Sequence, residues 1–289
     1  MSELLSLSSS PSPTFVSFGY RCSAAGILKK LGLKHESFPF DWMISRLDVV
    51  SHAIGDDDFA AFMSAENYVP VHSNTYARTH DITDQRVVCD EYLQINRVYG
   101  RDFVRRDAGE LTSTYTYRCA TNHHNITCSE GAAYYARCVE RWRAMMLAAA
   151  CGGQPNIIYL HISPVYFVAD FREQRTQLFA EIVRVNRALV AKTGMDARGL
   201  VFFLVDAACG GGEAAETSAS MYELTVDGVD VCSDDDNDNV YLRMSKIYIV
   251  NVNAGFIDAG EIFMGDCARE EEFICGIVRE VAAGDVMTW

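Results

Sequence analysis

Residues 14–42 read TFVSFGYRCSAAGILKKLGLKHESFPFDW, and this stretch decides the fold that we expect for the chain. Its first residues, Phe15–Phe18, are of the aromatic and β-branched types that favour a strand. Gly19 and Cys22 follow, and from there apolar residues recur at helical spacing until Gly32, a plausible stop. The order strand, glycine turn, cysteine, helix predicts that the thiol of Cys22 lies where a helix begins.

A cysteine at the start of a helix is placed for nucleophilic chemistry. The unpaired N–H groups and the positive end of the helix dipole stabilise the thiolate, which is the reactive form. Backbone N–H groups around Cys22 would also bind the oxyanion of an acyl substrate. The alternative is that Cys22 is an ordinary buried residue, since cysteine behaves as a small hydrophobic side chain in many cores.

Farther along, continuous apolar segments alternate with amphipathic ones. The strands that we expect are 156–162, 200–206 and 246–252, and the helices are 129–151, 170–193 and 270–282. Apolar strands separated by amphipathic helices are typical of a mostly parallel sheet that is covered on both faces. We therefore predict an α/β fold that forms a single domain over residues 14–289, preceded by a flexible tail over residues 1–13.

The composition is that of an acidic globular protein. The chain has 289 residues, 49% of them hydrophobic, and a formal net charge of −14. This charge argues against nucleic acid or an anionic membrane as a partner, because phosphate binding needs a basic face. The ten cysteines are irregularly spaced and no signal peptide precedes them, so we expect reduced thiols and a cytoplasmic location.

Three other segments suggest ligands but lack part of the required pattern. Residues 119–128 contain two cysteines and two histidines, but neither a C-x-x-C nor an H-x-x-x-H pair for zinc. The acidic run 234–238 lacks the glycine and glutamate of a calcium loop, and Gly210–Gly212 is not followed by Lys-Ser/Thr. We predict no metal and no cofactor.

The opening stretch also resembles the signature of a domain family described as papain-like cysteine peptidases, which reads roughly S-(L/F)-G-x-x-C-x-x-A-x-x-L-(x)-G-L and then P-F-D-W. The matching positions are Ser17, Gly19, Cys22, Ala25, Leu28, Gly32, Leu33 and Pro39–Trp42. The resemblance implies that Cys22 is the nucleophile and that the histidine of a His-Asp pair, here His80–Asp81, is the base. Because the family pattern finds little match over residues 87–128, an insertion is expected there.

The partners of Cys22 are open to more than one interpretation. His80 is the first candidate for the base, His161 in a predicted strand is the rival because α/β proteins place functional side chains at strand ends, and His35 ranks third. Asp41 would orient the histidine, or it would cap a turn and pair with a basic side chain such as arginine. Asp81 points away from His80 if both lie in a strand.

Two functions follow from these observations. The first is a cysteine-dependent hydrolase or acyl transferase that uses Cys22, His80 and Asp41 on a peptide or acyl substrate. The second is a catalytically inactive family member that serves as a structural or interaction subunit of a larger assembly, such as a virion. The alternative fold is an α+β papain-like division; a third interpretation, an esterase-like three-layer fold, lacks the usual serine and a terminal Asp-x-x-His.

Overall fold

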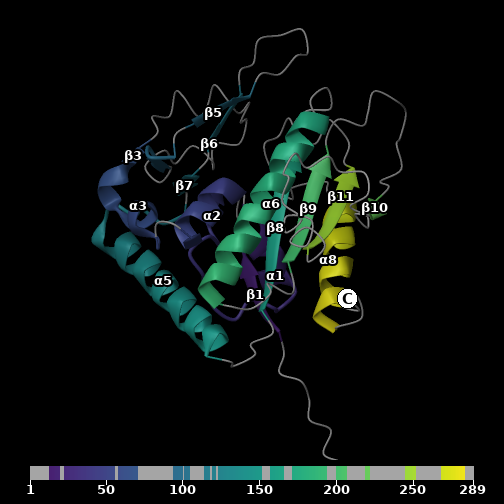
Figure 1. Cartoon of the computed structure of the whole chain (residues 1–289), viewed down its shortest axis with the longest axis horizontal. Helices are drawn as coiled ribbons and strands as arrows, with labels where there is room; N and C mark the ends of the chain where they lie inside the picture. The colour runs from purple at the N-terminus through teal and green to yellow at the C-terminus, as the bar shows by residue number, and fades with distance from the viewer. Residues whose placement is uncertain are drawn as a thin grey trace, which may run out of the picture.

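The computed structural model of the chain is shown in Figure 1. It describes residues 13–19, 23–55, 58–70, 94–99, 101–104, 114–117, 119–121, 123–151, 157–165, 171–193, 200–206, 219–221, 245–251 and 268–283. Cys22 and the His80–Asp81 pair lie outside these residues, whereas Asp41, His35 and His161 lie within them.

A five-stranded, mostly parallel sheet forms the centre of the fold. Its order is β1 (Thr14–Ser17), β8 (Ile157–Val165), β9 (Leu200–Asp206), β11 (Ser245–Asn251) and β10 (Ala219–Met221). The first four strands run parallel to one another, and β10 pairs antiparallel with β11. The predicted parallel sheet is thus confirmed, and its apolar strands are those that the sequence pattern indicated.

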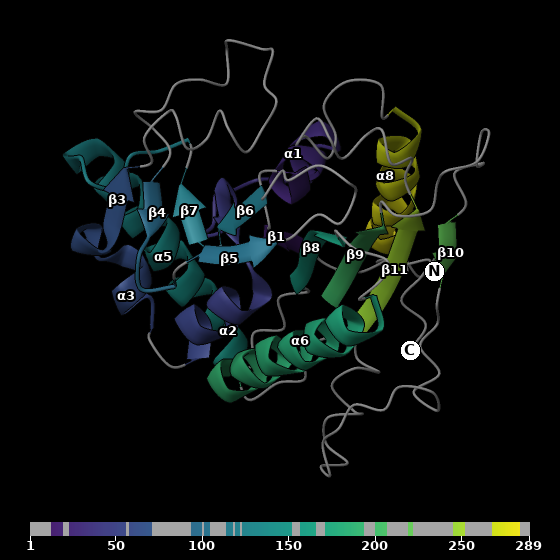
Figure 2. The same ribbon diagram turned by 90° about the horizontal axis from the view of Figure 1, so that it is seen from above.

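Helices cover both faces of this sheet, as Figure 2 shows. One face carries α1 (Ser23–Lys30) and α8 (Ala268–Ala283), and the other carries α2 (Leu47–Gly55), α5 (Ser129–Ala150) and α6 (Phe171–Thr193). Successive side chains of a strand point to opposite faces, so Phe15 packs in the α1–α8 core whereas Val16 packs in the other core. The helices at 129–150 and 171–193 agree closely with the predicted ones.

A second, antiparallel sheet lies beyond the β1 edge, next to α3 (Ala60–Met63) and α5 (Figures 1 and 2). Its order is β2 (Met43–Ser45), β7 (Cys119–Thr121), β4 (Gln94–Asn96) and β3 (Tyr68–Pro70). Separately, β5 (Arg101–Val104) pairs antiparallel with β6 (Thr114–Tyr117). The four three-residue strands of the second sheet were not predicted, because three residues are too few to show an alternation.

The C-terminus of α1 and the N-terminus of α5 each have a clear local cause. Gly32 has a φ of 69°, and its N–H and that of Leu33 donate to carbonyls of the last turn of α1, so the predicted stop at Gly32 is confirmed. The cap of α5 is Cys128, whose sulfur accepts a hydrogen bond from Gly131 N at 3.4 Å. A turn in which Cys128 N bonds Asn125 O at 3.2 Å brings the thiol to this position.

Gly131 allows this turn to pack on α5, and replacing it should destabilise the fold. A Cβ at Gly131 would lie 1.8 Å from the carbonyl oxygen of Asn125, a contact that only a backbone shift can relieve. We expect Gly131→Ala to lower the free energy of unfolding by at least ~2 kcal/mol. Gly276→Ala in α8 is the matched control, because nothing lies within 4 Å of its added Cβ. Urea unfolding measures both, and an equal midpoint for the two variants would contradict this account.

Candidate active site

Two side chains, those of His161 and Ser45, form hydrogen bonds with the backbone that follows β1. Phe18 N continues the β1–β8 ladder by donating to Leu160 O at 2.8 Å. The carbonyl of Phe18 then accepts a hydrogen bond from Nδ1 of His161 on β8. The carbonyl of Gly19 accepts two, one from Ser45 N at 3.1 Å and one from Ser45 Oγ, both from β2. The backbone just upstream of Cys22 is therefore tied to both sheets.

His161 is a neutral hydrogen-bond donor in this arrangement. A carbonyl oxygen can only accept, so the proton lies on Nδ1 and Nε2 is the acceptor nitrogen. The residue is 1% exposed, and burial lowers the pKa of its imidazole to about 4, against the opposing effect of the Phe18 carbonyl. The strand runs on to Val165, so His161 lies in the middle of β8 rather than at its end. His35, by contrast, is exposed.

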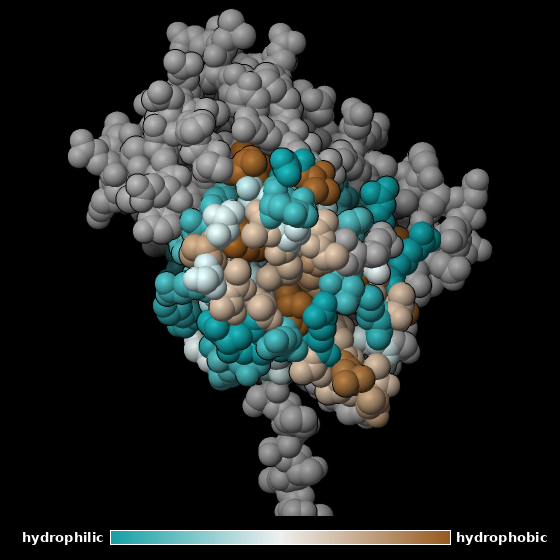
Figure 3. Space-filling view, turned by 90° about the vertical axis from the view of Figure 1, so that its left-hand side faces the viewer, coloured by the Kyte–Doolittle hydropathy of each residue, from teal (hydrophilic) through white to brown (hydrophobic). Residues whose placement is uncertain are grey.

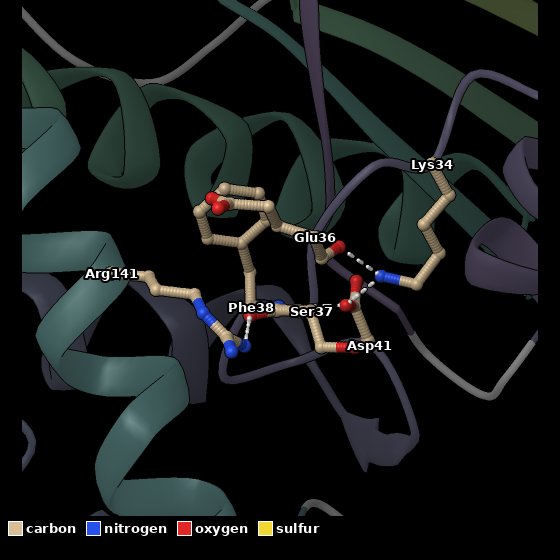
Figure 4. Close-up of polar contacts among 6 residues, drawn as sticks. All are labelled: Lys34, Glu36, Ser37, Phe38, Asp41 and Arg141. Atoms are coloured by element: carbon tan, nitrogen blue, oxygen red, sulfur yellow. Dashed lines mark hydrogen bonds and ion pairs between the residues drawn. The ribbon is translucent and has the colours of Figure 1, made fainter.

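Asp41 lies in a tight turn of the P-F-D-W segment, shown in Figure 4. Its Oδ2 accepts a hydrogen bond from Phe38 N at 2.7 Å and pairs with Nζ of Lys34, which also donates to Glu36 O at 2.6 Å. Burial raises the pKa of the Asp41 carboxyl, and the positive charge of Lys34 opposes that rise. Asp41 thus caps the turn and has a basic partner, as one of the two interpretations expected, although the base is lysine rather than arginine.

The other carboxylate oxygen, Oδ1, is buried and has no hydrogen-bond partner among the residues that the structure describes. Arg141 of α5 reaches the same turn and donates to Ser37 O at 3.3 Å. The turn is therefore fixed by two contacts: the hydrogen bond from Arg141 of α5 and the Lys34–Asp41 ion pair. The interaction of Asp41 with His80 stays a prediction.

Aromatic packing joins the two halves of the signature. The ring of Phe40 meets Phe18 edge to face with centroids 5.9 Å apart, and Phe18 stacks on Tyr159 of β8 at 4.8 Å. Trp142 of α5 contacts Phe18 and Phe40 at 6.0 and 6.4 Å. Because aromatic pairs of this geometry add to the energy of burial, the P-F-D-W turn is fixed directly against the end of β1.

The cysteine and histidine side chains of residues 119–128, which suggested zinc, each have a different partner. Cys119 is buried with its sulfur 3.7 Å from the Tyr68 hydroxyl, and burial raises the pKa of its thiol to about 12. Cys128 caps α5, His123 packs against Trp42, and His124 stacks on Tyr134 with centroids 3.7 Å apart. Within the described part of the chain, no three His, Cys, Asp or Glu side chains are grouped to hold a metal ion.

Two residues of this region, Ser45 and Lys34, were not predicted from the sequence. Ser45 carried no signal, because a serine three residues after the signature is common and only the pairing of β2 brings it to Gly19. Lys34 carried a weak one: a carboxylate among aromatic residues needs a cation, and Lys34 is seven positions away.

Comparison with known proteins defines the class. Residues 13–206 match the model of a family described as "putative papain-like cysteine peptidase", and the chain belongs to this family. Over 106 residues the chain is 34% identical to an uncharacterized protein of Acanthamoeba polyphaga mimivirus, a match that covers 35% of this chain and 48% of that protein. The chain thus spans about half the length of this curated relative. No solved structure matches.

Two further findings bear on the environment of the protein. Among the helices that the structure describes, none combines the length and the hydrophobicity that crossing a membrane requires. Five cysteines in the described residues are free thiols: Cys119, Cys128, Cys138, Cys151 and Cys275.

Removing the cation from the buried pair should be costly. Lys34→Met leaves the Asp41 carboxylate buried without its partner, which we expect to lower the free energy of unfolding at pH 7 by ~3–5 kcal/mol. The deficit should shrink in acid, because the unpaired carboxyl takes up a proton more readily in the folded protein. Lys30→Met is the control, since Lys30 pairs with Glu271 on the surface and its side chain is 54% exposed. Equal losses in the two variants, measured by urea unfolding, would contradict a structural role for the Lys34–Asp41 pair.

The neutral state of His161 predicts acid sensitivity. An unfolded chain binds a proton at this imidazole below about pH 6.5, whereas the folded protein does so only near pH 4. Its contribution to stability is therefore complete above pH 6.5 and falls by roughly 3 kcal/mol as the pH drops to 4. Melting temperatures between pH 7.5 and 4 should fall less steeply for His161→Asn than for the wild type. The exposed His35 provides the control variant His35→Asn, which should follow the wild-type curve.

Proposed function

We propose that this protein is a cysteine-dependent hydrolase or acyl transferase whose nucleophile is Cys22. The observation that carries the proposal is the strand-to-helix connection between β1 and α1. In sequence, Cys22 directly precedes Ser23, the first residue of α1, and it follows a strand end whose two carbonyls are held by buried donors. Membership of a family described as cysteine peptidases supports the same chemistry.

The reaction follows from the residue types. The thiol of Cys22 gives its proton to an imidazole, and the thiolate attacks the acyl carbon while N–H groups at the start of α1 bind the oxyanion. The leaving group takes the proton from the imidazolium, and a thioester remains. Water, or another nucleophile in an acyl transfer, then displaces the thiol, which recovers its proton.

His80 remains the first candidate for the base. Burial lowers the pKa of His161 to about 4, so its imidazole is a weak acceptor for a thiol whose ordinary pKa is about 8.5. Asp41 is proposed to orient the base through Oδ1, the oxygen that Lys34 and Phe38 N leave unoccupied. The substrate is proposed to be a peptide or another acyl compound, and the compartment to be the cytoplasm, where free thiols persist.

The second candidate is a catalytically inactive subunit of a larger assembly, such as a virion. The observation that favours it is the similarity to an uncharacterized viral protein. Figure 3 shows the side of the molecule that carries α3 and α5, where polar side chains are interspersed with apolar ones. Leu147 on α5 is 65% exposed and would contact a partner.

Iodoacetamide labelling of each cysteine against pH distinguishes the two functions. If Cys22 is a nucleophile, it should react fastest at pH 7, with a midpoint well below the ordinary value of about 8.5. The exposed Cys151, which follows the end of α5, serves as the reference, and the buried Cys119 and Cys138, whose thiol pKa values burial raises, should label slowly. Peptide mass spectrometry reads all sites at once.

The same experiment identifies the base and tests the alternative. His80→Ala should shift the midpoint of Cys22 upward by about one unit or more if His80 pairs with the thiol. A wild-type Cys22 that reacts no faster than the exposed Cys151 would reject the enzyme and favour the inactive subunit.

A further inference from the structure

We propose that His161 and Ser45 are positioning residues that fix the backbone leading into Cys22. This inference rests on the proposed function and adds two residues to its machinery. Its basis is the pair of consecutive carbonyls, Phe18 O and Gly19 O, which are held by donors from two different sheets. His161 and Ser45 are 1% and 0% exposed, so water cannot replace either donor.

The site lies where the regular ladder of β1 ends. Phe18 N makes the last backbone bond to β8, and beyond it side chains take over the hydrogen bonding of the chain. The two bonds that Ser45 makes to a single oxygen fix both the position and the direction of the Gly19 carbonyl. A glycine there would otherwise be free to rotate, since it lacks the Cβ that restricts other residues.

Cys22 is close in sequence to the two carbonyls that His161 and Ser45 bind. Cys22 is three residues after Gly19, so the two α-carbons can be separated by no more than ~10–11 Å. Ser23, directly after Cys22 in sequence, is the first residue of α1. Errors of about 1 Å in the placement of a reacting group cost on the order of 100-fold in rate, so loosening one anchor should be measurable.

The hydrogen-bond chemistry separates positioning from catalysis. Nδ1 of His161 is the donor to Phe18 O, and asparagine presents an N–H₂ group at a similar distance along its side chain. His161→Asn therefore keeps the donor but has no basic nitrogen, whereas His161→Leu has neither. Ser45→Ala removes Oγ and leaves the backbone bond of Ser45 N to Gly19 O in place.

The test measures two properties of each variant: the labelling midpoint of Cys22, and deuterium exchange of the peptide that spans residues 18–23. His161→Leu should raise the exchange rate of that peptide about tenfold or more and move the Cys22 midpoint toward about 8.5, because under the proposed function the thiolate loses the stabilisation that a fixed backbone gives it. Ser45→Ala should change both in the same direction by less, and His161→Asn should stay near the wild type. Ser51→Ala is the matched control. Ser51 Oγ also donates to a half-buried backbone carbonyl, Asp48 O at 2.9 Å, but this bond lies within α2 and away from Cys22 in the sequence.

The outcomes are distinct. Unchanged exchange in both His161→Leu and Ser45→Ala overturns the inference, whatever the thiol does. If His161→Asn behaves like His161→Leu in the labelling midpoint while its exchange stays normal, His161 is the base itself and the positioning role is wrong. An ordinary wild-type midpoint rejects the proposed enzyme, and the exchange data then still decide whether the two residues fix this segment. Melting curves of all variants confirm that each one folds.

Discussion

The pairing of β1 with β8 is the interaction on which the rest of the structure depends. It is a parallel pairing between segments far apart in the chain, with Ser17 opposite Leu160, and it brings His161 to Phe18 across 143 residues. Parallel strands need a crossover between them, and here the crossover contains the whole antiparallel sheet and α5. The main sheet, the two helical layers and the end of β1 are all placed by this one ladder.

The second constraint is the removal of polar groups from water around the signature. Asp41, Phe18 and Gly19 are buried, so the Asp41 carboxylate and the carbonyls of Phe18 and Gly19 each require a partner inside the protein. Lys34, His161 and Ser45 provide them. The rings of Phe18, Phe40 and Trp142 pack against one another in the same part of the core, so aromatic packing and hydrogen bonding fix the signature together.

The large elements were predictable and the small ones were not. Helices α5 and α6 and strands β8, β9 and β11 carry long periodic or continuous apolar patterns, so their bounds agree with the prediction to within a few residues. The three-residue strands β2, β3, β4 and β7 have no pattern of their own, because their extended shape comes from pairing with one another. The cap of α5 was likewise not visible in the sequence, since the Asn125–Cys128 turn decides which side chain reaches the helix end.

By itself, the sequence determined the order of strand, glycine, cysteine and helix, the family signature, and hence Cys22 as the candidate nucleophile. These are local features, and local features are visible in neighbouring residues. Only the tertiary structure decided that Lys34 neutralises Asp41, that Ser45 holds Gly19, and that His161 faces Phe18 as a neutral donor. The physical reason is that the partner of a buried polar group is chosen by strand pairing and packing, and these join residues that no sequence spacing connects.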